Sequence, residues 1–438
     1  MNSLTDKDGN RTTSTNDTLK TLLEAHFQED SLPQPECSEK EGDDSVIKCI
    51  LTEKRLKRII STLPKNKAPG NDNIKNEMIT KTWDHIGGPL THIFYLCLKI
   101  GKCPKIWKNS RGIAIAKPNK TDYTNPRAFR IITLTSNLQK LLERAILDYL
   151  EKDLKIDKKL TKNQFGFRKK KSTQAAIHKI TRKIEDSLAN GHFTLGIFLD
   201  VEGAFDSIRF RSIKEALEKT KIPETISNWI YNMINDREIT ITLHGVSLSR
   251  KIHKGCPQGG ILSPLLWNLT LNTLLDRYDL DRDSIICYAD DMAIIISGFD
   301  LNATMRLIAI RYLKTIDKWC TANGVKLSAT KTQLILFRTK NKKFKLDPIV
   351  IRGQTLHLTD EVTYLGVILD KYLSWTPHIT AKTIVANKKL KMTKALIGKE
   401  WGLEPKALRY IYNDVIFPGI SYACFVWQHK CLSNKSIT

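Results

Sequence analysis

The most constraining feature of the sequence is a pair of adjacent carboxylates between two short apolar runs. Residues 285–296 read IICYADDMAIII, so Asp290 and Asp291 interrupt a segment rich in isoleucine. Short apolar runs bounded by turn-forming residues are typical of buried strands, and aspartate is favoured in turns. We therefore predict a tight hairpin whose tip is Ala289–Asp291. Such a pair could also be a solvent-exposed acidic tip, so its chemistry depends on what lies beside it.

A second apolar run also ends in an acid. Residues 195–206 read LGIFLDVEGAFD, and Asp200 follows the apolar stretch directly. If this strand lies beside the hairpin, Asp200 and Asp290 can share a divalent cation. Carboxylate oxygens suit Mg²⁺, which retains waters and takes further ligands from substrate phosphates. Two such ions, roughly 3.5–4 Å apart, are the usual clamp for in-line phosphoryl transfer, one at the attacking oxygen and one at the leaving group.

The two acidic motifs resemble those of reverse transcriptases. Residues 288–291, YADD, resemble the YxDD motif, and residues 198–206 resemble the first palm motif of that family. The wording DVEGAFD is most similar to non-LTR (LINE-type) retrotransposons of the jockey-like and I-like groups. Further motifs follow in the family's order between about residues 55 and 430. The resemblance implies an α+β right-hand polymerase with fingers, palm and thumb, in which an antiparallel palm sheet carries the YADD hairpin.

The resemblance also implies a metal site and a set of catalytic groups. Two Mg²⁺ ions, with Mn²⁺ as a substitute, are expected at Asp200, Val201, Asp290 and Asp291. Lys331 lies in the segment LSATKTQLILF, which resembles a further palm motif, and a lysine there can act as general acid toward pyrophosphate. A structural or phosphate-screening role is the alternative for Lys331.

Two motifs are expected to contact the incoming nucleotide. Residues 126–136 resemble the fingers motif YRPISL, with Phe and Ile in place of its Tyr and Pro, so Arg130 is expected to grip the triphosphate through a forked guanidinium contact. Residues 253–265 resemble the motif G.PQGS.LSP, with Gly in the usual Ser position. Gln258 is the expected contact to the templating pair or the nucleotide, and Gly259 belongs to a turn that lets the backbone approach closely.

The segment that follows Asp200 contains one aromatic residue and two further acids that could belong to the site. By resemblance, Phe205 closes the sugar pocket and excludes a ribose 2′-hydroxyl; an ordinary core phenylalanine is the alternative. Glu202 and Asp206 are additional acids near the site and are not assigned as ligands. Capping of the following helix is an alternative role for Asp206.

A basic segment with interleaved aromatics is expected to bind the template. Residues 164–173, QFGFRKKKST, resemble the motif Q.GFR...ST. Bases of a single strand can stack on aromatic rings while phosphates meet the positive charges. The expected contacts are Phe165, Phe167, Arg168, Lys169 and Lys170, and the alternative is a solvated charged face.

Charge and composition set the organisation of the chain. Lys and Arg number 70 against 46 Asp and Glu, a net charge of +24, which indicates a polyanionic partner, nucleic acid before membrane. Residues 1–45 are polar and poor in aromatics, and we expect a disordered linker or N-terminal remnant with a short helical patch at 19–27. The resemblance places fingers at 46–185, the palm with some interleaved fingers segments at 186–372, and the thumb with a truncated C-terminal connection at 373–438.

The expected location is intracellular. Nine cysteines without a CxxC pair suit free thiols in a reducing compartment. We find no secretory signal pattern and no apolar run approaching roughly 18 residues. A soluble protein of the nucleus, the cytoplasm or both is therefore predicted, without a membrane partner.

These features together predict an RNA-directed DNA polymerase that extends a primer 3′-hydroxyl on an RNA template by two-metal nucleotidyl transfer. Its expected partners are the RNA template, a DNA primer or nicked target DNA, and dNTPs. Element-encoded endonuclease or RNase H domains are expected to be absent from this chain. The alternatives are a catalytically inactive, truncated nucleic-acid-binding remnant and an RNA-dependent RNA polymerase, which shares the palm.

Overall fold

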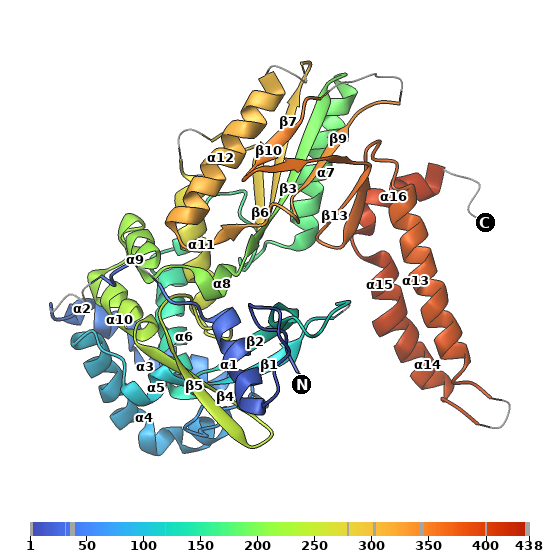
Figure 1. Ribbon diagram of the computed structural model, residues 1–438. Helices are drawn as coiled ribbons and strands as arrows, with labels where there is room; N and C mark the ends of the chain where they lie inside the picture. Colours follow the sequence, from blue (N-terminus) through green and yellow to red (C-terminus); the bar gives the residue numbers. More distant parts are fainter. Residues whose placement is uncertain are drawn as a thin grey trace. The chain divides into compact units, whose positions relative to one another are not determined.

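A computed structural model describes residues 3–30, 32–35, 40–118, 120–277, 280–300, 304–340, 346–398 and 401–433 of the chain (Figure 1). The chain divides into two compact units, each assembled from separate stretches. The first unit comprises Met1–Thr161, Val201–Arg277 and Lys318–Lys326, and the second comprises Lys162–Asp200, Tyr278–Asp317 and Leu327–Thr438. Both units combine helices with mainly antiparallel sheets, which confirms the predicted α+β class. The stretches of the two units interleave along the chain.

The first unit contains a four-stranded sheet in the order β2-β1-β4-β5. The β1–β2 and β4–β5 pairs are antiparallel and the central β1–β4 pair is parallel. Its strands are β1 (Asn109–Ala116), β2 (Phe129–Leu134), β4 (Arg237–Leu243) and β5 (Val246–Ile252). Its helices are α1 (Thr15–His26), α2 (Asp44–Ile50), α3 (Glu53–Ser61), α4 (Asn76–Lys99), α5 (Lys105–Lys108), η1 (Pro126–Ala128), α6 (Asn137–Lys152), η2 (Ile156–Lys159), α8 (Ala204–Ser207), α9 (Phe210–Lys219), α10 (Glu224–Ile234) and α11 (Ser263–Leu275).

The N-terminal segment differs from the predicted disordered linker. Ser14 caps α1 by accepting a hydrogen bond from the backbone nitrogen of Asp17. The helix contacts β4, β5 and η1, and it buries Leu19, Leu22 and Leu23 almost completely. The helical patch expected at 19–27 lies within α1, which begins earlier, at Thr15. The expectation of a disordered linker is wrong for residues 15–26, which form an amphipathic helix whose apolar face contacts the sheet.

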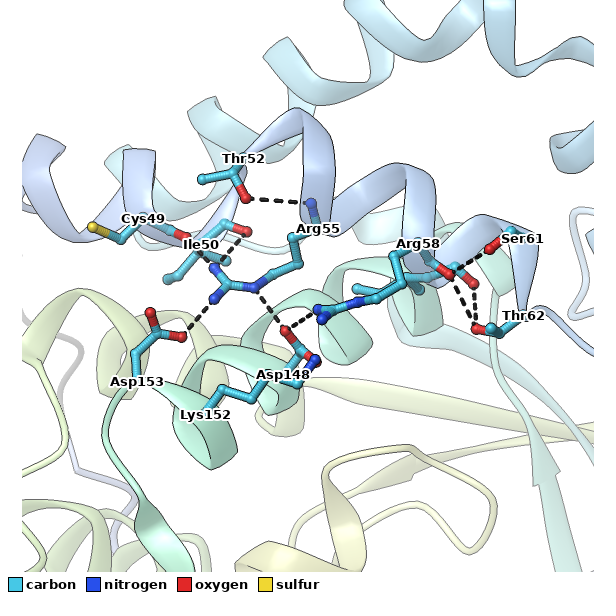
Figure 2. A network of polar contacts seen from close by, with 11 residues as sticks. Cys49, Ile50, Thr52, Arg55, Arg58, Ser61, Thr62, Asp148, Lys152 and Asp153 are labelled. Atoms are coloured by element: carbon cyan, nitrogen blue, oxygen red, sulfur yellow. Dashed lines mark hydrogen bonds and ion pairs between the residues drawn. The ribbon is translucent and has the colours of Figure 1, made fainter.

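A buried arginine joins α3 to α6. Thr52 caps α3 by accepting a hydrogen bond from the Arg55 backbone nitrogen at 3.3 Å. The Arg55 guanidinium donates to Asp148 Oδ2 at 2.8 Å and to Asp153 Oδ2 at 2.5 Å, and it also donates to carbonyls at the end of α2 (Figure 2). Its side chain is only 9% exposed. One guanidinium thus fixes three helices to one another.

The carboxylate of Asp148 is shared among several cations. Besides Arg55, it pairs with Arg58 at 2.5 Å and with Lys152 at 2.8 Å (Figure 2). Burial alone would raise the pKa of Asp148, but the hydrogen bonds from Lys152 and Arg55 outweigh it and lower the pKa below its ordinary value. Asp148 is therefore ionised in the folded protein at neutral pH.

The second unit is built on a larger sheet in the order β12-β9-β3-β7-β6, with β8 also paired to β3. Its strands are β3 (Phe193–Glu202), β6 (Ile285–Tyr288), β7 (Asp291–Gly298), β8 (Lys326–Leu327), β9 (Gln333–Phe337) and β12 (Leu358–Thr359), and two separate hairpins comprise β10 (Ile349–Ile351), β11 (Gln354–Leu356), β13 (Glu361–Tyr364) and β14 (Val367–Asp370). Its helices are α7 (Thr173–Ala189), α12 (Arg306–Ala322), α13 (Thr376–Lys394), α14 (Pro405–Ile411), the π-helix η4 (Tyr412–Ile416), α15 (Phe417–Ser421) and α16 (Cys424–Ser433). β3, β8 and α12 run across the division between the units.

The central strands of this sheet are buried along nearly their whole length. Strand β3 pairs antiparallel with β7 on one side and with β9 on the other. Helix α7 contacts β6 and β7, and its Ile177, Ile180 and Ile184 share one core cluster with Ile286 and Ile295. Continuous apolar runs, rather than alternating ones, are what a sheet covered on both faces requires.

Helices follow the β13–β14 hairpin. Helix α13 carries exposed lysines at positions 388, 391 and 394, and it contacts β14 and α15. Within the described parts of the chain, no helix is both long and apolar enough to span a membrane.

Candidate active site

The two adjacent acids lie on different parts of one hairpin. Strands β6 and β7 pair antiparallel, with Tyr288 opposite Asp291, so Ala289 and Asp290 form a two-residue connection. Ala289 has φ of 57°, and a positive φ at the first linking residue matches the twist of paired strands. Asp290 therefore lies in the turn and Asp291 is the first residue of β7, one position away from the predicted boundary of the tip.

Asp200 and Asp291 face each other across neighbouring strands. They are register partners in the antiparallel β3–β7 pair. Residues directly opposite each other in such a pair project from the same face, and like charges in this position repel. Burial, and after it the charges of Asp290 and Asp200, together raise the pKa of Asp291 to about 6. The three acids therefore form one electrostatically coupled group.

Lys331 provides the positive charge at this group. Its Nζ lies 2.6 Å from Asp200 Oδ2, and it lowers the pKa of Asp291 against the acids. The turn that carries it is attached to β3, because the Ser328 backbone nitrogen donates to the Asp200 carbonyl at 3.1 Å. The lysine side chain is 55% exposed, so it can move when a ligand arrives. The structure thus brings together Asp200, Asp291 and Lys331 from three separated motifs.

The acids suit a divalent cation in charge and in donor chemistry. Burial and the charges of Asp290 and Asp200 disfavour the ionised form of Asp291, a costly arrangement that a cation would relieve. In the part of the chain that the structure describes, no three His, Cys, Asp or Glu are already spaced as a metal cluster. The Lys331 ammonium donates a hydrogen bond to Asp200 Oδ2. Binding of a metal ion at this oxygen would require the ion pair to open.

The QFGFR segment, residues 164–168, lies beside strand β6 of the hairpin. The Phe165 backbone nitrogen donates to the Cys287 carbonyl at 2.8 Å, and the Cys287 nitrogen donates to the Asn163 carbonyl at 2.9 Å. The segment therefore runs parallel to β6 as a short additional neighbour. A Cβ on Gly166 would lie 2.3 Å from the Ala289 backbone nitrogen, a distance no side chain can adopt. Glycine is thus required where this segment crosses the hairpin turn.

The predicted template contacts in this segment divide into two groups. Phe165 is 5% exposed, packs in the core of the second unit, and has Lys171 Nζ 4.4 Å from its ring centre. The prediction that its ring stacks on bases is therefore wrong, because the alternation of the segment turns Phe165 inward. Phe167 is 53% exposed, and Lys169 and Lys170 are exposed as well. Arg168 donates to the Gln164 carbonyl at 2.9 Å, which fixes the bend.

The predicted nucleotide-binding residues lie together in the first unit. Arg130 is exposed on β2, an edge strand of the four-stranded sheet. The Thr133 nitrogen on the same strand donates to the Gln258 carbonyl at 2.7 Å. This hydrogen bond joins β2 directly to residues 257–259, the PQG loop. Gly259 has φ of 124°, and a Cβ there would lie 2.7 Å from the Thr133 carbonyl oxygen. Close contact between the loop and the strand explains this glycine.

The acid after Phe205 has a different role from the predicted helix cap. Asp206 is 7% exposed and accepts a hydrogen bond from Gln258 Nε2 at 2.8 Å. Helix α9 begins at Phe210 after an Arg209 N-cap, so the capping alternative for Asp206 is wrong. Phe205 is partly buried, with its ring centre 6.1 Å from that of Trp267.

Sequence reasoning missed one buried acid that shapes the same loop. Glu143 of α6 is fully buried, and its Oε2 accepts hydrogen bonds from the backbone nitrogens of Ile261 at 2.7 Å and Leu262 at 2.9 Å. Its Oε1 accepts from Gln139 at 2.8 Å. The carboxylate thereby satisfies donors at the start of α11. A glutamate on the apolar face of an amphipathic helix was the signal that could have revealed it.

Coupled carboxylates at the end of an antiparallel sheet are an arrangement suited to metal-dependent phosphoryl transfer. Comparison with known proteins agrees with this class: the family model "Reverse transcriptase (RNA-dependent DNA polymerase)" matches residues 115–369. The chain therefore belongs to the reverse transcriptase family, which confirms the resemblance seen in its motifs.

The curated relatives are proteins of mobile elements. The chain is 28% identical over 387 residues to the probable RNA-directed DNA polymerase from transposon BS of Drosophila melanogaster, covering 86% of this chain and 42% of that protein. It is 28% identical over 385 residues to the RNA-directed DNA polymerase from mobile element jockey of the same species, covering 86% and 41%. The 115 kDa protein of the type-1 retrotransposable element R1DM is 24% identical, covering 84% and 35%. The chain thus spans less than half the length of these relatives.

Among solved structures, one similar chain is an apo telomerase from Candida tropicalis, truncated from its C-terminal domain. The TM-score is 0.41 at 13% sequence identity, over 67% of this chain and 59% of that chain.

Proposed function

We propose that this chain is an RNA-directed DNA polymerase of a non-LTR retrotransposon. In the reaction, the primer 3′-oxygen attacks the α-phosphate of a dNTP, a new phosphodiester bond forms, the bond to the β-phosphate oxygen breaks, and pyrophosphate leaves. The single observation that supports this most is the cross-strand pair of Asp200 and Asp291 beside the YADD turn. This pair lies within the stretch that matches the reverse transcriptase family.

The reaction requires charge neutralisation at the acids, and reverse transcriptases use divalent metal ions for it. Asp200, Asp290, Asp291 and the neighbouring Val201 would hold two Mg²⁺ ions, with Mn²⁺ as a substitute. When bound, such ions lower the pKa of the primer hydroxyl and neutralise the charge of the leaving pyrophosphate. Asp200 and Asp291 supply oxygens from one face of one sheet, and Asp290 supplies one from the turn.

The remaining residues position the nucleotide. Arg130 is proposed to bind the triphosphate, since a guanidinium on an exposed strand edge can form a forked contact to phosphate. Gln258 and Gly259 are proposed to approach the nucleotide through the PQG loop, and Phe205 to close the sugar pocket. Lys331 is proposed to act at the pyrophosphate side, after its release from Asp200.

Fingers, palm and thumb remain the proposed architecture. The sheet of β3, β6, β7 and β9 is the proposed palm, and the helices from α13 onward, with their exposed lysines, are the proposed thumb. Phosphate contacts by these lysines and by Lys169 and Lys170 would hold the template and primer. The proposed partners are therefore an RNA template, a DNA primer or nicked target DNA, and dNTPs, in the nucleus or the cytoplasm.

Primer extension tests this proposal. The wild-type chain is expected to incorporate dNTPs on a primed RNA template with Mg²⁺, and Asp290→Asn is expected to lose about a thousandfold or more in rate while still binding the primed RNA. Preference for NTPs over dNTPs would instead identify an RNA polymerase. Binding without extension by the wild-type chain would identify an inactive remnant.

A further inference from the structure

The side chain of Gln258 is held by a buried carboxylate. Its Nε2 donates to Asp206 Oδ2 at 2.8 Å, while its main-chain carbonyl accepts from Thr133 at 2.7 Å. A carboxylate can only accept, so the amide is oriented with its nitrogen toward Asp206 and presents its oxygen elsewhere as an acceptor. The residue is therefore fixed at both ends and in polarity.

Asp206 is itself fixed by the loop that carries Gln258. The Cys256 nitrogen donates to the Phe205 carbonyl at 2.6 Å, and the Gly255 nitrogen donates to the Ile208 carbonyl at 2.7 Å. A Cβ on Gly255 would lie 2.5 Å from the Asp206 carbonyl oxygen, so the two backbones touch. The carboxylate and the amide it binds thus belong to one closely packed unit.

The other neighbour of this carboxylate is His26, the last residue of α1. His26 is 4% exposed, and its Nε2 lies 3.2 Å from the Pro126 carbonyl, so Nε2 must carry a proton. Its Nδ1 lies 3.9 Å from Asp206 Oδ2 and has no hydrogen-bond partner among the described residues. A buried ring nitrogen left without a hydrogen bond is uncommon and costly. Here the carboxylate is the charged group beside it.

Arg237, a buried arginine, supplies positive charge near Asp206. Arg237 lies in the same interior and donates to the Gly255 carbonyl at 2.5 Å. Burial lowers the pKa of Arg237 to about 10, and the charge of Asp206 acts against that shift. A cation beside the carboxylate favours the charge-assisted hydrogen bond that Asp206 accepts from Gln258.

We propose that Asp206 is a positioning residue that fixes the amide of Gln258 for the incoming nucleotide. This inference rests on the proposed function, in which Gln258 contacts the nucleotide. It assigns to an acid of the first palm motif a role in binding rather than in metal coordination.

A double-mutant cycle on the full chain tests whether Asp206 acts through Gln258. Asp206→Ala is expected to raise the KM for dNTP about tenfold with kcat changed by less than about twofold, because one hydrogen bond to a charged group is lost. Asp206→Asn keeps an acceptor for the amide and is expected to retain most of the affinity. In a Gln258→Ala background, Asp206→Ala is expected to add no further loss, since it acts only through that amide.

The outcomes separate this inference from the proposed function. If Gln258→Ala leaves the KM unchanged, both the assigned role of Gln258 and the inference are wrong, although polymerase activity itself stands. If Gln258→Ala raises the KM but Asp206→Ala and Asp206→Asn behave like wild type, or if the effects multiply in the double variant, the inference alone is overturned. Thermal unfolding of each variant shows whether an effect on KM accompanies loss of fold.

Discussion

Asp200 and Asp291 oppose each other directly across β3 and β7, so two carboxylates project from the same face of one antiparallel ladder. A pair of like charges at this position destabilises a sheet. The sheet is therefore less stable at the point where the chemistry is proposed to occur. Lys331 compensates at Asp200 through its 2.6 Å contact, and its charge also lowers the pKa of Asp291 against the two neighbouring acids.

We predict that Asp291→Asn stabilises the metal-free protein while abolishing polymerase activity. The pKa of Asp291 is about 6 in the folded chain against an ordinary 3.8. Its stabilising contribution is therefore present below about pH 4 and is lost as the pH rises through about 6. The variant should gain about 1–2 kcal/mol at pH 7.5, less than the full pKa difference because the carboxyl is partly exposed.

Urea unfolding in EDTA at several pH values measures this effect. The control is Asp84→Asn, which removes an exposed acid on α4 and should leave both stability and activity unchanged. Equal stability of Asp291→Asn and wild type at pH 7.5 would contradict the assigned cause of the shift.

Substitutions at Lys331 distinguish charge compensation from proton donation. The ion pair with Asp200 leads us to expect that Lys331→Arg keeps activity within about fivefold, whereas Lys331→Met loses about a hundredfold. Arginine retains the charge but cannot give up its proton at working pH. Single-turnover extension rates at saturating dNTP provide the comparison. An arginine variant as impaired as the methionine variant would establish Lys331 as the general acid.

Gly166→Ala should impair both stability and catalysis through the hairpin. The new Cβ would lie 2.3 Å from the Ala289 nitrogen, so the YADD turn must shift. We expect a loss of about 1–3 kcal/mol in the free energy of unfolding and a lower kcat. Gly298→Ala, at the other end of β7, is the matched control, because its Cβ would make only an ordinary 3.4 Å contact with Met305. Similar behaviour of the two variants would rule out the supporting role of the QFGFR segment.

Arg55→Lys should separate stability from activity. The guanidinium contacts Asp148 and Asp153 at once, and an ammonium cannot reproduce both contacts, so we expect about 1–3 kcal/mol lower stability with unchanged extension kinetics at 25 °C. Lys57→Ala removes an exposed ion pair with Glu53 on the same helix and should change neither quantity. Altered kinetics in Arg55→Lys with an intact fold would connect this network to the site.

The sequence predicted local strands and turns better than it predicted the contacts between segments that are far apart in the chain. Apolar runs around Asp200 and Asp290 indicated strands, and turn residues located the hairpin within one position. The family resemblance, rather than periodicity, brought Lys331 into the site. The inward orientation of Phe165 and the contact between Gln258 and Asp206 depend on packing between segments far apart in the chain, which no local pattern records. The apolar patch at 19–27 indicated part of α1, but its packing against β4 and β5 could not be read from the local pattern.

The pairing order of β3 has a consequence for synthesis of the chain on the ribosome. Strand β3 ends at Glu202, yet both of its long neighbours are translated later, β7 from Asp291 and β9 from Gln333. At 5–20 residues per second, the 131 residues between positions 202 and 333 take roughly 7–26 s. Both edges of this apolar strand are open until β7 has been made, and one long edge stays open until β9 follows, so the strand can pair with other chains in the meantime. Slow translation, low temperature or a chaperone that covers this strand should therefore determine how much of the protein reaches its folded state.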